Sequence, residues 1–154
     1  MINILLSTYD FDNKNCFKKI KNIIKPNMKV LILPFAHNED VFKNEKNFNK
    51  LYDFDKGSEF NNIYKPFYNY GIQKENISVL NPFRDTEKYM KTKIKNTDIC
   101  FGVGGNPIVF MNMLKRLNIL EDLKLFNGIF IGASASAMIQ LEEFMTYYLP
   151  WEHY

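Results

Sequence analysis

Five short apolar runs alternate with helical patterns along this chain, and that alternation limits the folds open to it. The runs that predict strands span 2–7, 29–35, 77–81, 98–103 and 128–132. The helical patterns span 14–25, one or two segments within 37–70, and then 85–97, 107–119 and 120–126. Strands that are apolar on both faces need helices on both faces, which is typical of parallel sheets. The sequence therefore predicts an α/β fold: a three-layer, doubly wound, mostly parallel sheet with helices on both faces.

The composition suits a single globular domain spanning residues 1–154. Apolar residues make up 46% of the chain and charged residues 24%, with a net charge of only +3. Nearly all basic residues are scattered lysines rather than arginines, which argues against a nucleic-acid-binding surface. No apolar run is long enough to cross a membrane, and no targeting segment is visible. We therefore expect a cytoplasmic protein without membrane or nucleic-acid partners.

Three polar segments follow predicted strands and should meet at one edge of the sheet. They are AHNED (36–40), GGNP (104–107) and ASAS (133–136). In doubly wound α/β sheets, functional sites lie beyond the carboxyl ends of the strands. The sequence therefore predicts a site at this edge.

The segment FIGASASAM (130–138) fits a nucleophile elbow of the pattern G-x-S-x-G, with the last glycine replaced by serine. Such an elbow turns sharply from a strand into a helix and raises a serine hydroxyl above the sheet. The positions two before and two after that serine must be small, because strand and helix pass closely there. Around Ser134 they are Gly132 and Ser136, whereas around Ser136 one of them is the bulky Met138. Ser134 is therefore the predicted catalytic nucleophile.

The backbone near Ser134 offers hydrogen-bond donors for an oxyanion. The N–H of Ala135 lies at the start of a helix, where its partial positive charge suits a developing negative charge. A second donor is expected from the loop GVGGNP (102–107), where Gly104 and Gly105 let the backbone approach closely. Together with Asn106, these residues form the predicted oxyanion and substrate-binding set.

Two other interpretations of that loop stay open from the residues alone. The loop can be a plain strand-to-helix turn in which Asn106 caps the helix. It can also be a dinucleotide-binding loop, but Pro107 stands where that pattern needs its third glycine. No cofactor is therefore expected.

A resemblance to a known family emerges between residues 98 and 140, in DICFGVGGNPIVFMNMLKRLNILEDLKLFNGIFIGASASAMIQ. This segment resembles the peptidase E-like serine peptidases, which include aspartyl dipeptidase and cyanophycinase, in the class I glutamine amidotransferase-like superfamily. The matching motifs are the GGN turn at 104–106 and the elbow at 132–137. KVLILPFAHNED (29–40) also resembles the second strand and loop of a bacterial branch of that family.

The resemblance implies a glutamine amidotransferase-like, flavodoxin-like fold with Ser134 as nucleophile. It implies an oxyanion hole made of the N–H groups of Gly105 and Ala135. It also implies a substrate class, namely small peptides that are often cleaved next to an acidic residue.

Two departures from the family pattern bear on activity. Ser136 stands where the family has glycine. The family's catalytic histidine and its acidic partner follow the nucleophile on further strands, whereas this chain ends 20 residues after Ser134. We expect either a chain that lacks the family's C-terminal strands or a family member that has lost its triad.

The sequence contains two histidines that could serve as a base. His37 follows the second predicted strand, and Glu39 and Asp40 are placed to orient it. His153 is the penultimate residue and does not match the position of the family histidine. Neither pattern is typical of a serine peptidase base, and a serine without a paired base is a poor nucleophile at neutral pH.

A metal site is not expected. Asp53, Asp55 and Glu59 could attract a cation, but no histidine or cysteine lies at ligand spacing from them.

The leading hypothesis is a serine peptidase that hydrolyses short peptides through Ser134. The alternative is a catalytically inactive homologue that acts as a peptide-binding or interaction module. A glutamine amidotransferase is disfavoured because that class carries cysteine at the elbow. If the family's last strands are absent, an apolar sheet edge should be exposed, which would favour a homo-oligomer.

Overall fold

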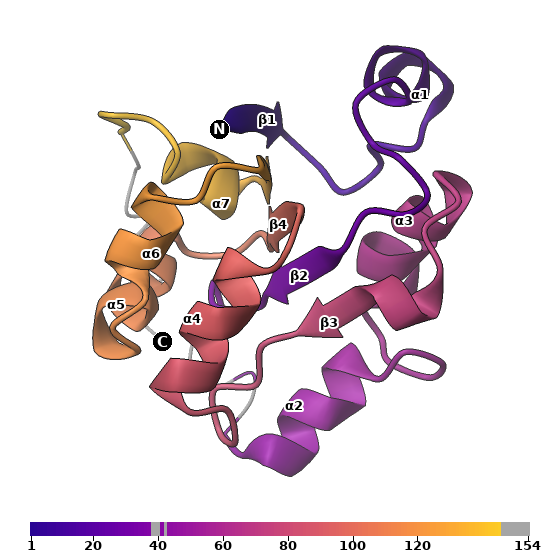
Figure 1. The fold of residues 1–154 in the computed structure, drawn as a ribbon. Coiled ribbons are helices and arrows are strands. Elements are labelled where there is room, and N and C mark those ends of the chain that lie inside the picture. The colour runs from indigo at the N-terminus through magenta and orange to yellow at the C-terminus, as the bar shows by residue number, and fades with distance from the viewer. Residues whose placement is uncertain (38–40, 42, 146–154) are drawn as a thin grey trace.

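The computed structural model describes residues 1–37, 41 and 43–145. Its sheet has five strands, all parallel, in the order β1-β5-β4-β2-β3 (Figure 1). They are β1 (Ile2–Leu6), β2 (Val30–Leu33), β3 (Ile77–Val79), β4 (Ile99–Gly102) and β5 (Ile129–Ala133). Each strand overlaps its predicted run, and the predicted α/β fold class is confirmed.

The helices lie between the strands in the chain. They are α1 (Lys14–Ile20), α2 (Glu45–Tyr52), α3 (Lys65–Asn69), α4 (Glu87–Lys95), α5 (Pro107–Arg116), α6 (Leu120–Lys124) and α7 (Ala135–Met138). A π-helical turn, η1 (Phe60–Tyr64), runs directly into α3, and a 3-10 turn, η2 (Lys74–Asn76), precedes β3. In Figure 1, α4, α5 and α6 form one group, while α1 and α3 lie apart from them. This arrangement is the one that right-handed crossovers produce around a parallel sheet.

Alternating side chains of β4 show which elements cover each face of the sheet. The ring of Phe101 packs against Phe11 and Phe67, with centroid distances of 5.8 and 5.3 Å. The next residue, Gly102, points to the opposite face, where Phe110 of α5 and Ser136 of α7 lie. Because strand residues alternate between faces, one face belongs to α3 and the loop after β1, and the other to α5 and α7.

An aromatic cluster holds the loop between β1 and α1 on the sheet. Phe11 contacts Phe67, Tyr70 and Phe101, and the Tyr70 hydroxyl donates a 2.7 Å hydrogen bond to the carbonyl of Phe11. Phe11, Phe67 and Phe101 are completely buried. The cluster therefore fixes the position of the residues just before it, including Tyr9.

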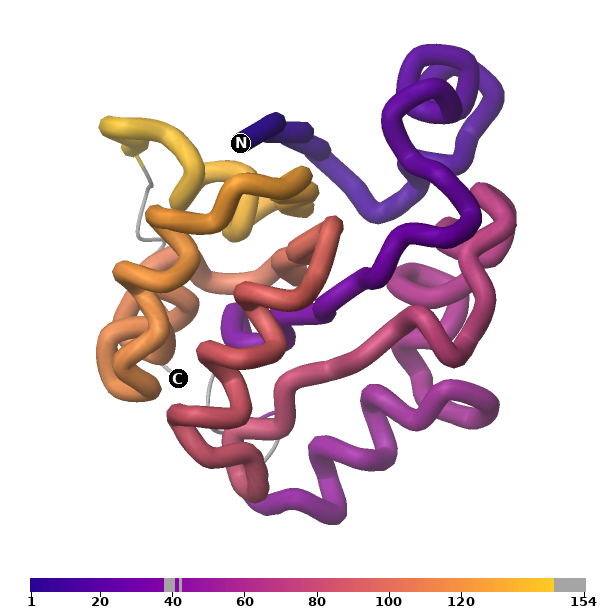
Figure 2. The backbone as a smooth tube through the Cα atoms, in the orientation of Figure 1, coloured from indigo at the N-terminus to yellow at the C-terminus, as the bar shows by residue number. Residues whose placement is uncertain are grey.

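The strand β1 forms one edge of the sheet, although its partner β5 lies more than a hundred residues later in the chain (Figure 2). Ile2 and Leu5 on this edge are 50% and 49% exposed. The sequence-based expectation of self-association through an exposed apolar edge stays a prediction.

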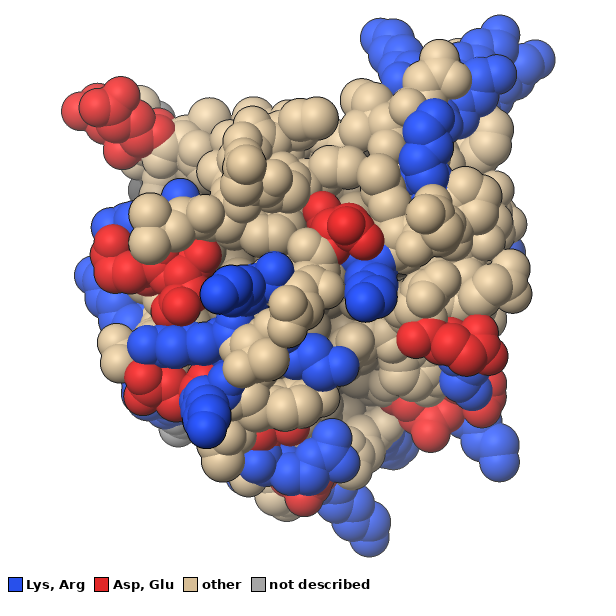
Figure 3. All heavy atoms as spheres, viewed as in Figure 1, with Lys and Arg blue, Asp and Glu red and all other residues tan. Residues whose placement is uncertain are grey.

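The surface drawn in Figure 3 carries both signs of charge side by side, apart from several lysines that gather over α1. Two of these are Lys18 and Lys19 in the last turn of that helix. Within the described ranges, the structure contains no helix with the length and apolar character of a membrane span.

We expect Phe67→Ala to lower the free energy of unfolding by about 3–5 kcal/mol, because it removes a buried ring and leaves a cavity. Denaturation in urea measures the change. Phe83→Ala is the control, since its ring is 44% exposed, and it should cost less than about 1 kcal/mol. Equal losses for the two variants would contradict the core described here.

Candidate functional site

Ser134 lies at the turn between β5 and α7 with φ 49° and ψ −107°. It is one of two described residues other than glycine with a positive φ. Residues with a side chain rarely adopt this backbone conformation. A nucleophile elbow requires a strained backbone of this kind. The N–H of Ser134 donates a 2.9 Å hydrogen bond to the carbonyl of Leu6, which ties the elbow to β1. Ser134 is exposed, whereas Ser136 is completely buried.

The elbow depends on close approach between β4, β5 and α7. A Cβ on Gly132 would lie 2.3 Å from the carbonyl oxygen of Ser136, and a Cβ on Gly102 would lie 2.4 Å from the Cβ of Ser136. Real atoms do not approach so closely. Position 132 therefore needs glycine because the backbone of α7 lies against it, and position 102 needs glycine while residue 136 carries a Cβ.

The hydroxyl of Ser136 joins two strands. Its oxygen accepts a 2.8 Å hydrogen bond from the N–H of Ala133. Its proton is within reach of the carbonyls of Gly102 and Ala133, and the Gly102 carbonyl is the nearer. Ser136 therefore connects the end of β4 to the end of β5.

The loop after β4 lies beside the elbow. Gly105 has φ 144°, a conformation that favours glycine, and a Cβ there would lie 2.4 Å from the carbonyl oxygen of Ala36. The N–H of Asn106 donates to that same carbonyl at 2.8 Å. A Cβ on Gly104 would lie 3.3 Å from the Cβ of Ser134. The structure thus brings residues 104–106 to the same edge of the sheet as Ser134.

The side chain of Asn106 caps helix α5. Its Oδ1 accepts hydrogen bonds from the N–H groups of Ile108 and Val109, at 2.9 and 3.2 Å. This is the role that the plain-turn interpretation predicted, and it occupies the amide oxygen. The N–H of Gly105 is different, because Gly105 is exposed and donates to no described residue.

Tyr9 also reaches this edge, although the sequence did not single it out. Its hydroxyl accepts a 2.6 Å hydrogen bond from the N–H of Gly104. Its ring lies against Phe101 at a centroid distance of 6.2 Å. Burial raises the pKa of Tyr9, although the hydrogen bond from Gly104 opposes the rise. A signal was available, because Tyr9 follows the first predicted strand and so belongs to the carboxyl edge.

The fold is similar to that of a solved structure. A crystal structure of a candidate peptidase E protein from Listeria monocytogenes EGD-e superposes with a TM-score of 0.62 and 20% sequence identity. The match covers 90% of this chain and 60% of that protein. The fold is peptidase E-like. No protein-family model matches the chain, and no curated protein matches its sequence.

His37 lies at the carboxyl end of β2 in this peptidase E-like fold. It is half-buried, and its ring centroid is 6.5 Å from that of Tyr52. Burial lowers the pKa of His37, while the negative charge of Glu59 opposes the change. The same carboxylate contributes to the raised pKa values of Tyr9 and Tyr52, after burial. Glu59 is therefore a second residue near the site whose role in it the sequence did not predict.

Two histidine-related predictions concern residues that the structure does not describe. Glu39 and Asp40, which were expected to orient His37, lie outside the described residues, and so does His153.

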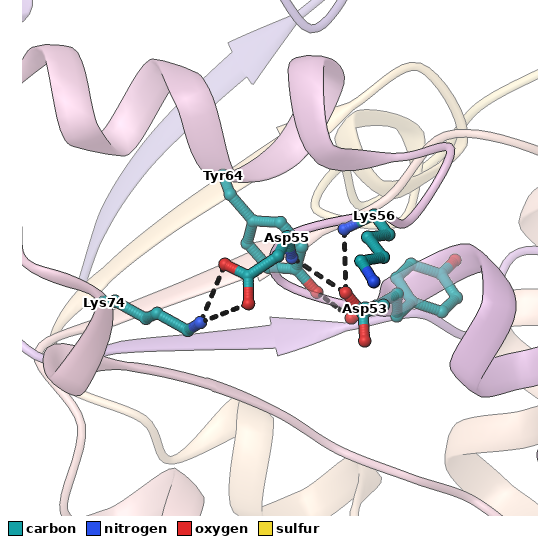
Figure 4. A network of polar contacts seen from close by, with 6 residues as sticks. Asp53, Asp55, Lys56, Tyr64 and Lys74 are labelled. Carbon is teal, nitrogen blue, oxygen red and sulfur yellow. Dashed lines mark hydrogen bonds and ion pairs between the residues drawn. The ribbon is translucent and has the colours of Figure 1, made fainter.

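Two of the acidic residues weighed as a metal site, Asp53 and Asp55, make turn and ion-pair contacts (Figure 4). Oδ1 of Asp53 accepts hydrogen bonds from the N–H groups of Asp55 and Lys56, at 2.9 and 2.8 Å. Asp55 pairs with Lys74 at 2.9 Å. Over the described part of the chain, no three acidic, histidine or cysteine side chains gather as a metal site would require.

We expect Gly102→Ala to lower the free energy of unfolding by about 1–3 kcal/mol, because the new methyl group would overlap Ser136. Ser136→Gly removes the overlapping Cβ, so the double variant should lose less than the sum of the two single losses, by about 1 kcal/mol or more. Ser136→Ala keeps the Cβ and is the matched control, which should not relieve Gly102→Ala. Urea denaturation gives all the values, and strictly additive losses would show that the two residues do not meet.

The lowered pKa of His37 predicts a pH dependence of stability. The folded state holds His37 neutral below its ordinary pKa of 6.5, so the unfolded state binds more protons in that window. Stability should therefore fall as pH drops through 6.5 towards the folded-state pKa. His37→Gln should show a flatter profile between about pH 5.5 and 7.5 in urea denaturation. Identical profiles for the two proteins would contradict the burial of His37.

Proposed function

We propose that this chain is a serine-type peptidase domain that hydrolyses short peptides, with Ser134 as the nucleophile. The observation that carries the proposal is the strained, exposed backbone of Ser134. Strain of this kind costs roughly 1–3 kcal/mol and persists where the surrounding structure holds it, commonly at active sites. The peptidase E-like fold and the resemblance of residues 98–140 to that family support the same function.

In the proposed reaction, Oγ of Ser134 attacks the carbonyl carbon of a peptide bond. The carbonyl oxygen becomes an oxyanion, which accepts hydrogen bonds from the N–H groups of Gly105 and Ala135. The carbon–nitrogen bond then breaks, and the amine leaves with the proton that a base took from Ser134. Water hydrolyses the resulting ester and regenerates the serine.

The oxyanion-hole donors in this scheme have an expected effect on the reaction rate. An oxyanion-hole donor contributes about 10²–10³-fold to the rate. The N–H of Ala135 suits this role because it begins α7 and has no acceptor within that helix. Of the two histidines in the sequence, His37 is the one within the described edge of the sheet, and its lowered pKa keeps it neutral at pH 7.

A fluorophosphonate probe tests the proposed nucleophile. Oγ of Ser134 would form a bond to phosphorus and displace fluoride, leaving a stable adduct on the protein. Wild type should be labelled, Ser134→Ala should not, and Ser58→Ala should react like wild type because Ser58 is an exposed serine in a turn. Equal labelling of wild type and Ser134→Ala would refute the proposed nucleophile.

A second candidate function is a peptide-binding module without turnover. The observation in its favour is that the Ser134 side chain makes no hydrogen bond with any described residue. In particular, no described histidine is paired with it. Calorimetry with acidic dipeptides would show saturable binding and no hydrolysis. Detectable hydrolysis would exclude this function.

A further inference from the structure

The side chain of Tyr9 crosses the end of the strand that carries Ser134. Tyr9 follows β1, and its hydroxyl contacts the N–H of Gly104, which follows β4. In the sheet, β5 lies between β1 and β4. A side chain that joins the ends of β1 and β4 therefore passes the end of β5, where Ser134 lies.

The position of Gly104 shows how near these groups are. A Cβ on Gly104 would lie 3.1 Å from the hydroxyl oxygen of Tyr9 and 3.3 Å from the Cβ of Ser134. Tyr9 and Ser134 therefore border the same small space, and a side chain at position 104 would crowd both of them.

The hydroxyl of Tyr9 has a proton to donate. Its oxygen already accepts the N–H of Gly104, so the O–H must point to a different group. Among the residues that the structure describes, none accepts it. Because burial raises the pKa of Tyr9 above its ordinary 10.0, the hydroxyl keeps this proton at neutral pH.

We propose that the Tyr9 hydroxyl donates a hydrogen bond to the substrate oxygen that becomes negatively charged when Ser134 attacks. This inference rests on the proposed function. It adds a side-chain donor to the N–H groups of Gly105 and Ala135. It also assigns a different role to the N–H of Gly104, which holds the Tyr9 hydroxyl in place instead of binding the oxyanion. The fitting substrate is the carbonyl group of a peptide or ester.

The test compares Tyr9→Phe with Tyr70→Phe. Both variants remove one tyrosine hydroxyl, but the hydroxyl of Tyr70 donates its hydrogen bond to the carbonyl of Phe11, within the aromatic cluster. In a fluorophosphonate probe, the phosphoryl oxygen takes the place of the oxyanion. Tyr9→Phe should be labelled about 10- to 100-fold more slowly than wild type. Tyr70→Phe should lose stability while keeping the wild-type labelling rate.

A second measurement tests the role of Tyr9 even if the probe does not label the wild-type protein. In the Ser134→Ala background, calorimetry gives the affinity for a short acidic dipeptide, and adding Tyr9→Phe should weaken it about tenfold. If wild type is labelled and Tyr9→Phe reacts at the same rate, the role of Tyr9 is wrong while the proposed function stands. If wild type is not labelled, the proposed function fails. In that case the affinity for the dipeptide tests the role of Tyr9. Unchanged affinity on adding Tyr9→Phe, or no binding at all, overturns that role, whereas a tenfold loss of affinity supports contact between Tyr9 and the substrate.

Discussion

The backbone of Ser134 has a conformation that residues with a side chain avoid, and the contacts around it hold it in that conformation. Its N–H donates to Leu6 in β1, and its carbonyl accepts the N–H groups of Ala137 and Met138 in α7. The hydroxyl of Ser136 joins β4 to β5. Strand and helix can approach this closely because glycine stands at the contact positions. The strain is therefore balanced by hydrogen bonds and packing from three strands and a helix.

The parallel sheet determines which residues can take part in the site. All strands end at one edge, so the residues that follow β1, β2, β4 and β5 come together although they are far apart in the chain. Tyr9, His37, Gly105 and Ser134 reach the edge in this way. The aromatic cluster on one face and α5 with α7 on the other hold these loops from both sides.

Much of the fold could be predicted from the sequence, because runs that are apolar on both faces have few alternatives to a covered parallel sheet. The choice of Ser134 over Ser136 followed from the size of Met138. The structure exposes Ser134 and buries Ser136, and the role of Ser134 as nucleophile stays a prediction. Tyr9 follows the first predicted strand, so its place at the carboxyl edge could have been predicted. Its neighbours there, and the place of Glu59, could not, because strand order decides which loops are neighbours and no local pattern encodes it. The hydrogen bonds of Ser136 were not predicted either. Its small size suggested only that it could stand in for glycine, whereas the partners of its hydroxyl depend on the register of β4 against β5.

The central claim is that the elbow holds Ser134 in a strained conformation, and the relative stability of two variants tests it most directly. Ser134→Gly and Ser134→Ala both remove the hydroxyl, but only glycine tolerates a positive φ without strain. Urea denaturation should show Ser134→Gly to be more stable than Ser134→Ala by about 1 kcal/mol or more. If Ser134→Ala is instead the more stable by about 0.5–1 kcal/mol, as at an ordinary backbone position, Ser134 does not lie on a strained elbow.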